Sequence, residues 1–434
     1  EADKKGEARL QAAKAAVEQL AFATHRASGT LYAYDEGEKV LQKGGDSALG
    51  ELLLNELGVH HSRHEHKEIR AKVKALTYRD EIGGGEFIPV ANGDLVLQGG
   101  SYEPHLQDID PQRAPLHRSP AAWNPEADCP LWQKHLQETV ASEPERKTLQ
   151  EYAGYGLLSW ALPFHKALFA VGPTASGKST TIDVLRYLYG KVASVSPQQL
   201  VNGRFGPAEL EGAWVNARSD ISAALLQDIG LFKEITAGDP IHVERKYEQG
   251  YTIAPKAKHL YSANRLPDVA VDDDAFYRRI LVVSFPNTIP REDRVRKDAL
   301  NAGFEEEIDG ILRWAVEGLA RLLSESGFTY DLSPADTRRQ WNAHATSIGR
   351  FKAGRLEVTG DHKGDFEPKD HVFSAYSQFC EDNGLEKEGQ RKLTRTLKKD
   401  SMISDADRTP PGHSSQTPCY TGIVLQEADS DSPF

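Results

Sequence analysis

Four residues near the middle of the chain have the types and spacing of a phosphate-binding loop. In "VGPTASGKST" (171–180), Gly172, Gly177, Lys178 and Ser179 follow the pattern G-x-x-x-x-G-K-S. In such loops backbone N–H groups surround the phosphates, the lysine reaches the β- and γ-phosphates, and the hydroxyl binds Mg²⁺. The pattern arises by chance in roughly 1–2% of chains of this length. We therefore expect ATP and Mg²⁺ as cofactors, bound by Gly172, Pro173, Thr174, Ala175, Ser176, Gly177, Lys178, Ser179 and Thr180.

A nucleotide hydrolase also needs a carboxylate that holds the metal ion and orients water. The segment "AWVNARSDIS" (213–222) reads as a strand that ends at Ser219 and Asp220. We predict that Asp220 joins Ser179 at the metal. The alternative is an ordinary aspartate in an exposed turn.

A β-hairpin is predicted between "IHVERK" (241–246) and "YTIAP" (251–255), because a short turn separates two strand-like runs. Basic residues beside an aromatic ring at a hairpin tip suit contact with single-stranded DNA. The alternative is a solvated hairpin that binds nothing. The predicted DNA contacts are Arg245, Lys246 and Tyr247 at the tip, with Lys256 and Lys258 on the next strand.

Polar residues also follow or precede the next two predicted strands. Asn264 ends a strand and is placed to contact the γ-phosphate or the attacking water, unless it only caps the turn before Pro267. Arg278 and Arg279 precede an apolar strand. An arginine supplied across a subunit boundary stabilises the charge on a transferring phosphoryl group. The alternative is an ion pair with Asp272, Asp273 or Asp274.

These residues need elements that bring them together. The apolar run "HKALFAV" (165–171) predicts a buried strand before the loop, and the following helical pattern ends at Gly190. Strands and helices alternate over residues 161–290, which is typical of an α/β nucleotide-binding core.

The order of these motifs resembles the superfamily 3 helicases, above all the primase–helicases of phages, plasmids and large DNA viruses. The loop is followed by Asp220, "ITAGDPIHVERKY", "SANRLP" and "FYRRI". Upstream, "IPVANGDLVLQGGSYEPH", "NPEADCPLWQKHLQE" and "LQEYAGYGLL" resemble the poxvirus-type domain that precedes that motor. The resemblance covers nearly the whole chain.

The resemblance implies a multidomain α/β protein with an AAA+ type P-loop core that forms a ring, usually a hexamer. It implies 3′-to-5′ movement on single-stranded DNA, with Lys246 as the DNA-contacting lysine, Asn264 as the γ-phosphate sensor, and Arg278 or Arg279 as the finger. The second acidic motif often ends in two acidic residues, whereas Ser219 precedes Asp220 here, which leaves Glu234 as a weaker candidate.

We expect five segments along the chain. They are a mostly helical helicase-associated domain (1–140), the ATPase core (141–325), a linker (326–366), a winged-helix-like domain (367–427) and an acidic tail (428–434). The basic helix 387–399 of the winged-helix-like domain either touches duplex DNA or is a solvated face.

Composition narrows the class. The 434 residues are 39% hydrophobic and 27% charged, which describes a soluble globular protein, and no run of 18 apolar residues suggests a membrane span. The net charge of −12 argues against a chain-wide nucleic-acid-coating surface but allows a local basic channel. Cys129, Cys380 and Cys419 form no disulfide or zinc pattern, which favours the cytoplasm of a prokaryotic or virus-infected cell. The only methionine is Met402, so we expect a fragment or processed chain and leave open a primase domain upstream.

Other interpretations remain at this stage. The run "HHSRHEH" (60–66) invites a metal site, but a polar helix start explains it better, because zinc sites usually bring a second ligand cluster. The main functional alternative is an ATP-switched assembly or packaging protein that does not separate strands. A metabolic kinase is a third class, but it gives no reason for a basic hairpin or an arginine pair.

Overall fold

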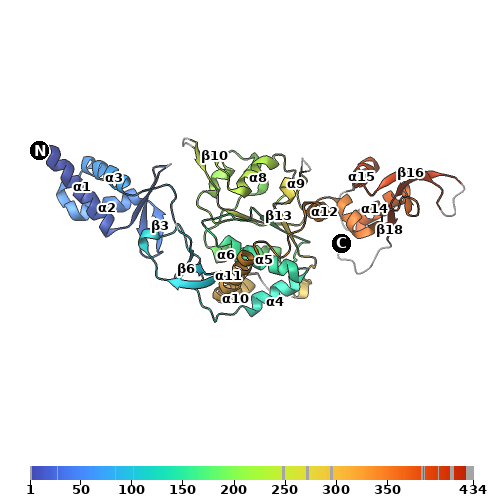
Figure 1. The fold of residues 1–434 in the computed structure, drawn as a ribbon, viewed down its shortest axis with the longest axis horizontal. Coiled ribbons are helices and arrows are strands. Elements are labelled where there is room, and N and C mark those ends of the chain that lie inside the picture. The colour runs from blue at the N-terminus through green and yellow to red at the C-terminus, as the bar shows by residue number, and fades with distance from the viewer. Residues whose placement is uncertain are drawn as a thin grey trace.

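The structure is a computed structural model that describes residues 2–26, 28–83, 85–100, 102–246, 250–269, 273–293, 297–382, 385, 387–398, 400–410 and 415–426. Tyr247, Lys399 and the acidic tail therefore lie outside the described residues. The chain forms an elongated molecule in which the first helices lie at one end, a parallel sheet in the middle and the last helices at the other end (Figure 1). It is a multidomain α/β protein, as predicted.

The first unit packs three helices against a four-stranded sheet with order β3-β2-β1-β4. Its helical part agrees with the prediction, but the sheet was not predicted. Leu49, Leu53, Ile69 and Val73 fill the space between helices and sheet. The elements are α1 (Ala2–Gln19), β1 (Phe22–His25), β2 (Leu31–Asp35), β3 (Val40–Lys43), α2 (Gly45–Leu57), η1 (Gly58–His60), α3 (Arg63–Leu76) and β4 (Tyr78–Arg79).

A three-stranded antiparallel sheet and two helices follow. Ile88, Leu95, Trp132 and Tyr152 from these elements belong to the same buried cluster as the central sheet. The boundary predicted at residue 140 therefore falls inside one packed unit. The elements are β5 (Ile88–Val90), β6 (Gly93–Gln98), β7 (Glu103–Gln107), η2 (Pro111–Arg113), α4 (Pro130–Thr139) and α5 (Glu143–Gly156).

The central sheet has four parallel strands in the order β13-β8-β12-β9. Its strands are almost wholly buried, because helices cover both faces, and this explains their continuous apolar runs. Alternate residues face two clusters, so Leu168 packs toward α5 and α11 while Phe169 packs toward Phe232 and Trp341. The strands are β8 (Ala167–Val171), β9 (Val215–Arg218), β12 (Lys258–Ala263) and β13 (Ile280–Ser284).

Helices and a hairpin connect these strands, as the alternating pattern predicted. The connecting elements are α6 (Lys178–Tyr189), α7 (Pro197–Asn202), η3 (Gly206–Leu210), α8 (Ile229–Ala237), β10 (Ile241–Val243), β11 (Tyr251–Ile253) and α9 (Asp274–Tyr277). After β13 come η4 (Arg291–Asp293), α10 (Lys297–Glu306) and α11 (Ile308–Glu325). α6 ends where Gly190 adopts a φ of 73°, a conformation that favours glycine.

The prediction of a linker over 326–366 is wrong. Two helices, α12 (Pro334–Ala345) and α13 (Ser347–Arg355), occupy most of this range. Trp341 of α12 is buried against Phe169 and Phe276 of the central unit, and its indole N–H donates to the carbonyl of Pro267. Burial of this large ring holds α12, which begins at the Ser333 N-cap and Pro334, against the central unit.

The last unit has its own core of Phe351, Tyr376, Phe379, Leu393 and Tyr420. Two helices and a three-stranded antiparallel sheet of order β15-β17-β16 lie where the sequence predicted helices and a β-wing. The elements are β14 (Leu356–Val358), β15 (Phe366–Pro368), α14 (Lys369–Asp382), α15 (Gln390–Leu397), β16 (Ser404–Arg408), β17 (Thr417–Thr421) and β18 (Ile423–Leu425).

Candidate functional site

Three predicted site residues meet at one edge of the central sheet. Gly172 follows β8, Asn264 follows β12 and Asp220 lies just after β9, and these three strands are parallel neighbours. The carboxyl ends of parallel strands meet at the same edge, which is where open α/β sheets bind ligands. The sequence order therefore translates into one spatial site.

The two loop glycines are required by close packing. A methyl group at Gly172 would lie 2.0 Å from the carbonyl oxygen of Phe285. A methyl group at Gly177, whose φ is 92°, would lie 2.7 Å from Cγ2 of Thr139. Gly177 caps α6 without any side-chain hydrogen bond to the first turn. The first N–H groups of α6 are thus left for another acceptor, as an anion site requires.

Lys178 turns back into the loop. Its Nζ donates to the carbonyls of Gly172 (2.8 Å) and Pro173 (2.5 Å) and to the hydroxyl of Ser176 (3.1 Å). Burial lowers the pKa of Lys178 to about 8, and the charge of Asp220 opposes that shift. The ammonium group is therefore shielded from water, at a position where phosphate oxygens could pair with it. Ser179, the next residue, is exposed.

The lowered pKa of Lys178 gives a prediction for nucleotide binding. In the free protein about half of the amine is neutral at pH 8, and bound phosphates favour the charged form. ATP binding at pH 8 should therefore take up about half a proton, and affinity should fall as the pH rises above 8. Calorimetry in two buffers of different ionisation enthalpy measures this uptake. The variant Lys178→Arg, whose guanidinium does not titrate, should show none.

Asp220 is held in an uncommon backbone conformation. Its φ is 54°, which is rare outside glycine, and its N–H donates to the hydroxyl of Ser262 at 3.2 Å. The carboxylate is exposed toward solvent. Strained backbone of this kind tends to occur at functional sites. Ser219 has a buried hydroxyl oxygen with no partner among the described residues, and Glu234 lies exposed on α8.

Arg278 and Arg279 lie at the opposite edge of the sheet. They precede Ile280, which pairs with Ala167 at the start of β8, whereas the loop follows Val171 at its end. The ends of a five-residue strand are about 13 Å apart, which exceeds the reach of an arginine side chain. Within one chain these arginines therefore do not meet the loop.

The two arginines differ in their freedom. Arg279 is half-buried and donates through Nη1 to the carbonyl of Ala275 at 2.7 Å, and burial lowers its pKa. Arg278 is exposed. Two of the aspartates considered as ion-pair partners for these arginines bind other residues. Asp273 pairs with Lys233 and Asp274 pairs with Arg338. Asp272 lies outside the described residues. The exposed Arg278 is better placed to reach a second molecule.

The predicted hairpin is confirmed: β10 and β11 pair antiparallel, with Ile241 opposite Ile253. Two of its predicted DNA contacts are engaged within the chain. Arg245 pairs with Glu211 at 2.5 Å, and Lys256 pairs with Glu81 at 2.6 Å. Lys246 is exposed in the turn that follows β10, three residues after Val243.

The prediction that Lys258 contacts DNA does not fit its position. Lys258 is fully buried in β12, and its Nζ donates to the carbonyl of Leu158 and lies 5.3 Å from the ring centre of Tyr155. Burial lowers its pKa well below the usual range. The side chain therefore caps the chain just after α5 and does not reach a ligand outside the sheet.

Lys258→Ala should accordingly destabilise the protein. The substitution removes the side chain that donates to the Leu158 carbonyl and leaves a cavity, at a cost of about 2–4 kcal/mol in the free energy of unfolding. Lys258→Met, which refills the cavity, should lose less. Urea unfolding measures both. Weaker DNA binding by a stably folded Lys258→Met protein would show that the amine acts on DNA.

Sequence reasoning missed an exposed pair beside the hairpin. Arg204 lies over the ring of Phe205 at 5.5 Å and pairs with Glu244 of the hairpin at 2.6 Å. Phe205 is 36% exposed. The signal in the sequence was the dipeptide Arg-Phe between Gly203 and Gly206, which marks a tight loop but not its neighbour.

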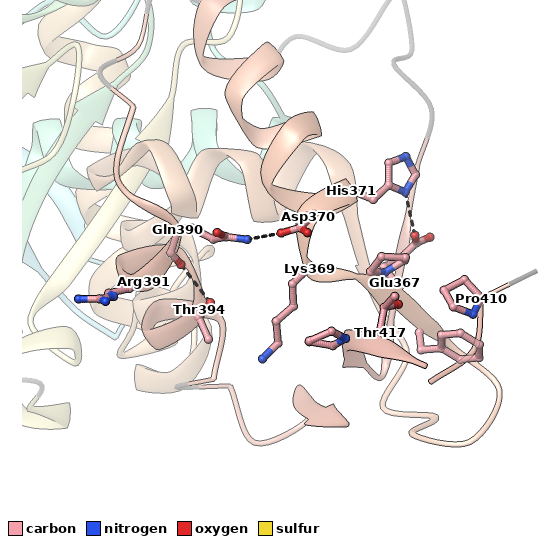
Figure 2. A pocket seen from close by; sticks show the side chains of 12 residues that line it. Glu367, Lys369, Asp370, His371, Gln390, Arg391, Thr394, Pro410 and Thr417 are labelled. Carbon is pink, nitrogen blue, oxygen red and sulfur yellow. Dashed lines mark hydrogen bonds and ion pairs between the residues drawn. The ribbon is translucent and has the colours of Figure 1, made fainter. Parts of the chain in front are cut away.

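A cavity of about 990 Å³ lies in the last unit, away from the loop. Figure 2 shows Gln390 joined to Asp370 and His371 joined to Glu367 across its wall. Lys369 pairs with Asp405, whose pKa is lowered to about 2 by Lys369 and Lys398. These polar groups have partners within the chain, while Arg391 points away from them (Figure 2).

Basic side chains lie on the exposed face of α15 and just after it, and two of them are paired, Lys392 with Glu388 and Lys398 with Asp405. Arg391, Lys392, Arg395 and Lys398 are all exposed, whereas Leu393 and Leu397 are buried. The predicted basic helix thus exists as an amphipathic helix over part of its range.

The histidine-rich run begins a helix, as predicted. Ser62 caps α3 by accepting from the N–H of Glu65, and the rings of His61 and His66 contact each other at 3.4 Å. Among the residues that the structure describes, no group of three or more histidine, cysteine or acidic side chains is arranged to hold a metal ion. Nor does any helix of this part of the chain have the length and apolar content needed to cross a membrane.

Comparison with known proteins found a family model that matches part of the chain and solved structures that resemble nearly all of it. The family described as "Family of unknown function (DUF5906)" matches residues 170–279, which run from the end of β8 to the arginine pair. No curated protein matches the sequence significantly. The apo structure of the NrS-1 C terminal region (305–718) is similar, with 11% identity and a TM-score of 0.50, and the match covers 96% of this chain and 99% of that one.

Two A form apo structures of the same NrS-1 region are 10% identical to this chain, each over 95% of it, with TM-scores of 0.40 and 0.47. They cover 99% and 100% of those chains. At such identity the first comparison establishes a shared fold over nearly the whole length of both proteins.

Proposed function

We propose that this chain is an ATP-dependent replicative DNA helicase of a virus, phage, plasmid or integrated element. The observation that carries the proposal is the division of the site between two edges of one sheet. The phosphate loop, Asp220 and Asn264 gather at the carboxyl edge, and Arg278 lies at the amino edge. A complete site then needs two copies, which is the arrangement of a ring with ATP between subunits.

Each residue at the carboxyl edge has a role when MgATP binds. Lys178 and the N–H groups of α6 hold the phosphates, Ser179 and Asp220 hold Mg²⁺, and Asn264 contacts the γ-phosphate or the attacking water. The metal supplies charge neutralisation of the phosphates. Asp220 is the acidic residue of the second sequence motif and lies at this edge, so it is also the group that we expect to orient the attacking water. Glu234 is the weaker candidate for this role.

The hairpin and the Arg204–Phe205 loop form the proposed contact with single-stranded DNA. The ion pair between Arg204 and Glu244 joins them. The ring of Phe205 stacks on a base, and Lys246 contacts a phosphate, which is how proteins bind single strands without sequence preference. The 3′-to-5′ polarity and the hexamer rest on the family resemblance. The exposed face of α15 touches duplex DNA, and a primase domain upstream of residue 1 fits the same resemblance.

The alternative of an assembly or packaging protein shares the ATP site but separates no strands. Displacement of a labelled strand from a tailed duplex distinguishes the two. Lys246→Ala should reduce unwinding at least about 10-fold while basal ATP hydrolysis is largely kept. Lys67→Ala, which removes an equally exposed lysine on α3, is the matched control. Unwinding that survives Lys246→Ala would show the hairpin assignment to be wrong, and no unwinding by the unaltered protein would favour the alternative.

A further inference from the structure

Helix α4 lies directly behind the phosphate loop, although it precedes the loop by more than 30 residues of sequence. Two of its side chains fill the space beside Gly177. A methyl group there would lie 2.7 Å from Thr139 Cγ2 and 3.0 Å from His135 Cε1. The hydroxyl of Thr139 donates to the carbonyl of His135 at 2.7 Å, so the two side chains form one local arrangement.

His135 also bonds to the helix that carries the loop lysine. Its Nε2 lies 3.0 Å from the hydroxyl oxygen of Thr181, in the first turn of α6 after Lys178. Both side chains are buried, and burial lowers the pKa of His135 to about 4. The ring is therefore neutral near pH 7 and makes one defined hydrogen bond without adding a charge beside the phosphates.

α4 is itself fixed at its other end. The N–H groups of Leu131 and Trp132 donate to the two carboxylate oxygens of Glu307, at 2.9 and 3.0 Å. The ring of Trp132 stacks on His135 with 5.7 Å between centres. Because Glu307 caps α4 and Trp132 packs beside His135, the imidazole has little freedom to move away from Thr181.

The chain just after α4 contacts the end of β13, which lies beside the start of the loop. The N–H of Ala141 donates to the carbonyl of Ser284, and Glu145 accepts from the N–H of Ser284 at 2.9 Å. Ser284 is followed by Phe285, whose carbonyl oxygen faces Gly172. One segment, residues 135–145, thus contacts the Gly177 end of the loop directly and the Gly172 end through Ser284 and Phe285.

We propose that His135 is a positioning residue for the nucleotide site. Its hydrogen bond to Thr181 fixes the first turn of α6, and that turn places Lys178 and the N–H groups that face the phosphates. The inference rests on the proposed function, because it assigns His135 to the same ATP site. It adds a residue from a segment that the sequence motifs of the motor do not include.

The test compares nucleotide binding with folding. Calorimetry with a non-hydrolysable ATP analogue is run at 20 °C, well below the melting temperature of each variant. His135→Ala should weaken binding about 10-fold, as loss of a supporting hydrogen bond does at other sites. His135→Gln, which keeps a group able to bond Thr181, should stay within about threefold. Thr181→Val should lower the affinity for the analogue as much as His135→Ala does, and Thr181→Ser should keep the affinity of the unaltered protein. The double variant His135→Ala with Thr181→Val should bind no more weakly than either single variant.

Several results would overturn the inference. They are a folded His135→Ala protein that binds the analogue normally, equal losses in the alanine and glutamine variants, or additive losses in the double variant. If His135→Ala does not fold, the Thr181→Val and Thr181→Ser pair decides the question alone, and equal affinities there overturn it. Failure of the unaltered protein to bind any nucleotide would instead refute the proposed function itself.

Discussion

Replacing Lys178 with alanine should reduce ATP hydrolysis by at least about 100-fold, because a single preorganised donor to a reacting group contributes that much at comparable sites. The ammonium group lies inside the loop, within 3.1 Å of three of its oxygens. Phosphate oxygens that enter the loop would take over these contacts. The alanine variant keeps the backbone N–H groups but loses the only cation that the structure shows inside residues 172–179.

Steady-state phosphate release measures the effect, and a fluorescent nucleotide separates loss of binding from loss of turnover. Lys191→Ala is the control, since Lys191 is exposed just beyond the end of α6. If the Lys178→Ala protein hydrolyses ATP at the normal rate, the reaction does not take place at this loop. A normal melting temperature for the variant ensures that a lost rate is not lost folding.

Arg278→Ala should lower ATP hydrolysis about 1,000-fold in assembled protein, in the range reported for arginines that act on a neighbour's nucleotide. The physical reason is the position of Arg278 at the sheet edge opposite the loop, where it cannot serve its own chain. Arg279→Ala should have a different signature. Its side chain donates to the carbonyl of Ala275 and is half-buried, so Arg279→Ala should also lower the free energy of unfolding.

A mixing experiment tests the action across the boundary. Arg278→Ala subunits have an intact loop, and Lys178→Ala subunits have an intact arginine. An equimolar mixture should regain up to about a quarter of normal activity, because about one boundary in four joins an intact loop to an intact arginine. Arg63→Ala, an exposed arginine of the first unit, should have normal activity alone. A mixture as inactive as its parts would mean that the arginine does not act in trans.

Local patterns predicted the elements around the loop. The apolar run before Gly172 gave a strand because a buried parallel strand needs apolar residues on both faces. The hairpin followed from turn residues between two short strand-like runs, and β10 and β11 pair antiparallel as expected. The gathering of Asp220 and Asn264 beside the loop followed from their places after strands.

Contacts between distant segments could not be predicted in this way. Lys258 looked like a basic residue near a hairpin, but its partner is the carbonyl of Leu158, 100 residues earlier in the chain. The docking of α12 was equally hidden, because the ring of Trp341 packs on Phe169 and Phe276, which are distant in the sequence. His135 lies in the upstream segment "NPEADCPLWQKHLQE", but that resemblance gave it no role, and its closeness to Thr181 depends on how α4 packs. Each of these contacts depends on tertiary packing, and tertiary packing leaves no periodic pattern in the sequence from which it could be predicted.

The left-handed backbone of Asp220 limits which residues can stand at that position. Asparagine and aspartate adopt a φ near 54° more readily than other non-glycine residues, whereas β-branched side chains do so rarely. Asp220→Asn therefore removes the charge without changing the backbone preference, and Asp220→Ala changes both. Random substitution at this codon should accordingly yield folded proteins mainly with asparagine, aspartate or glycine. Asp220→Asn is therefore the variant that tests the role of the carboxylate charge.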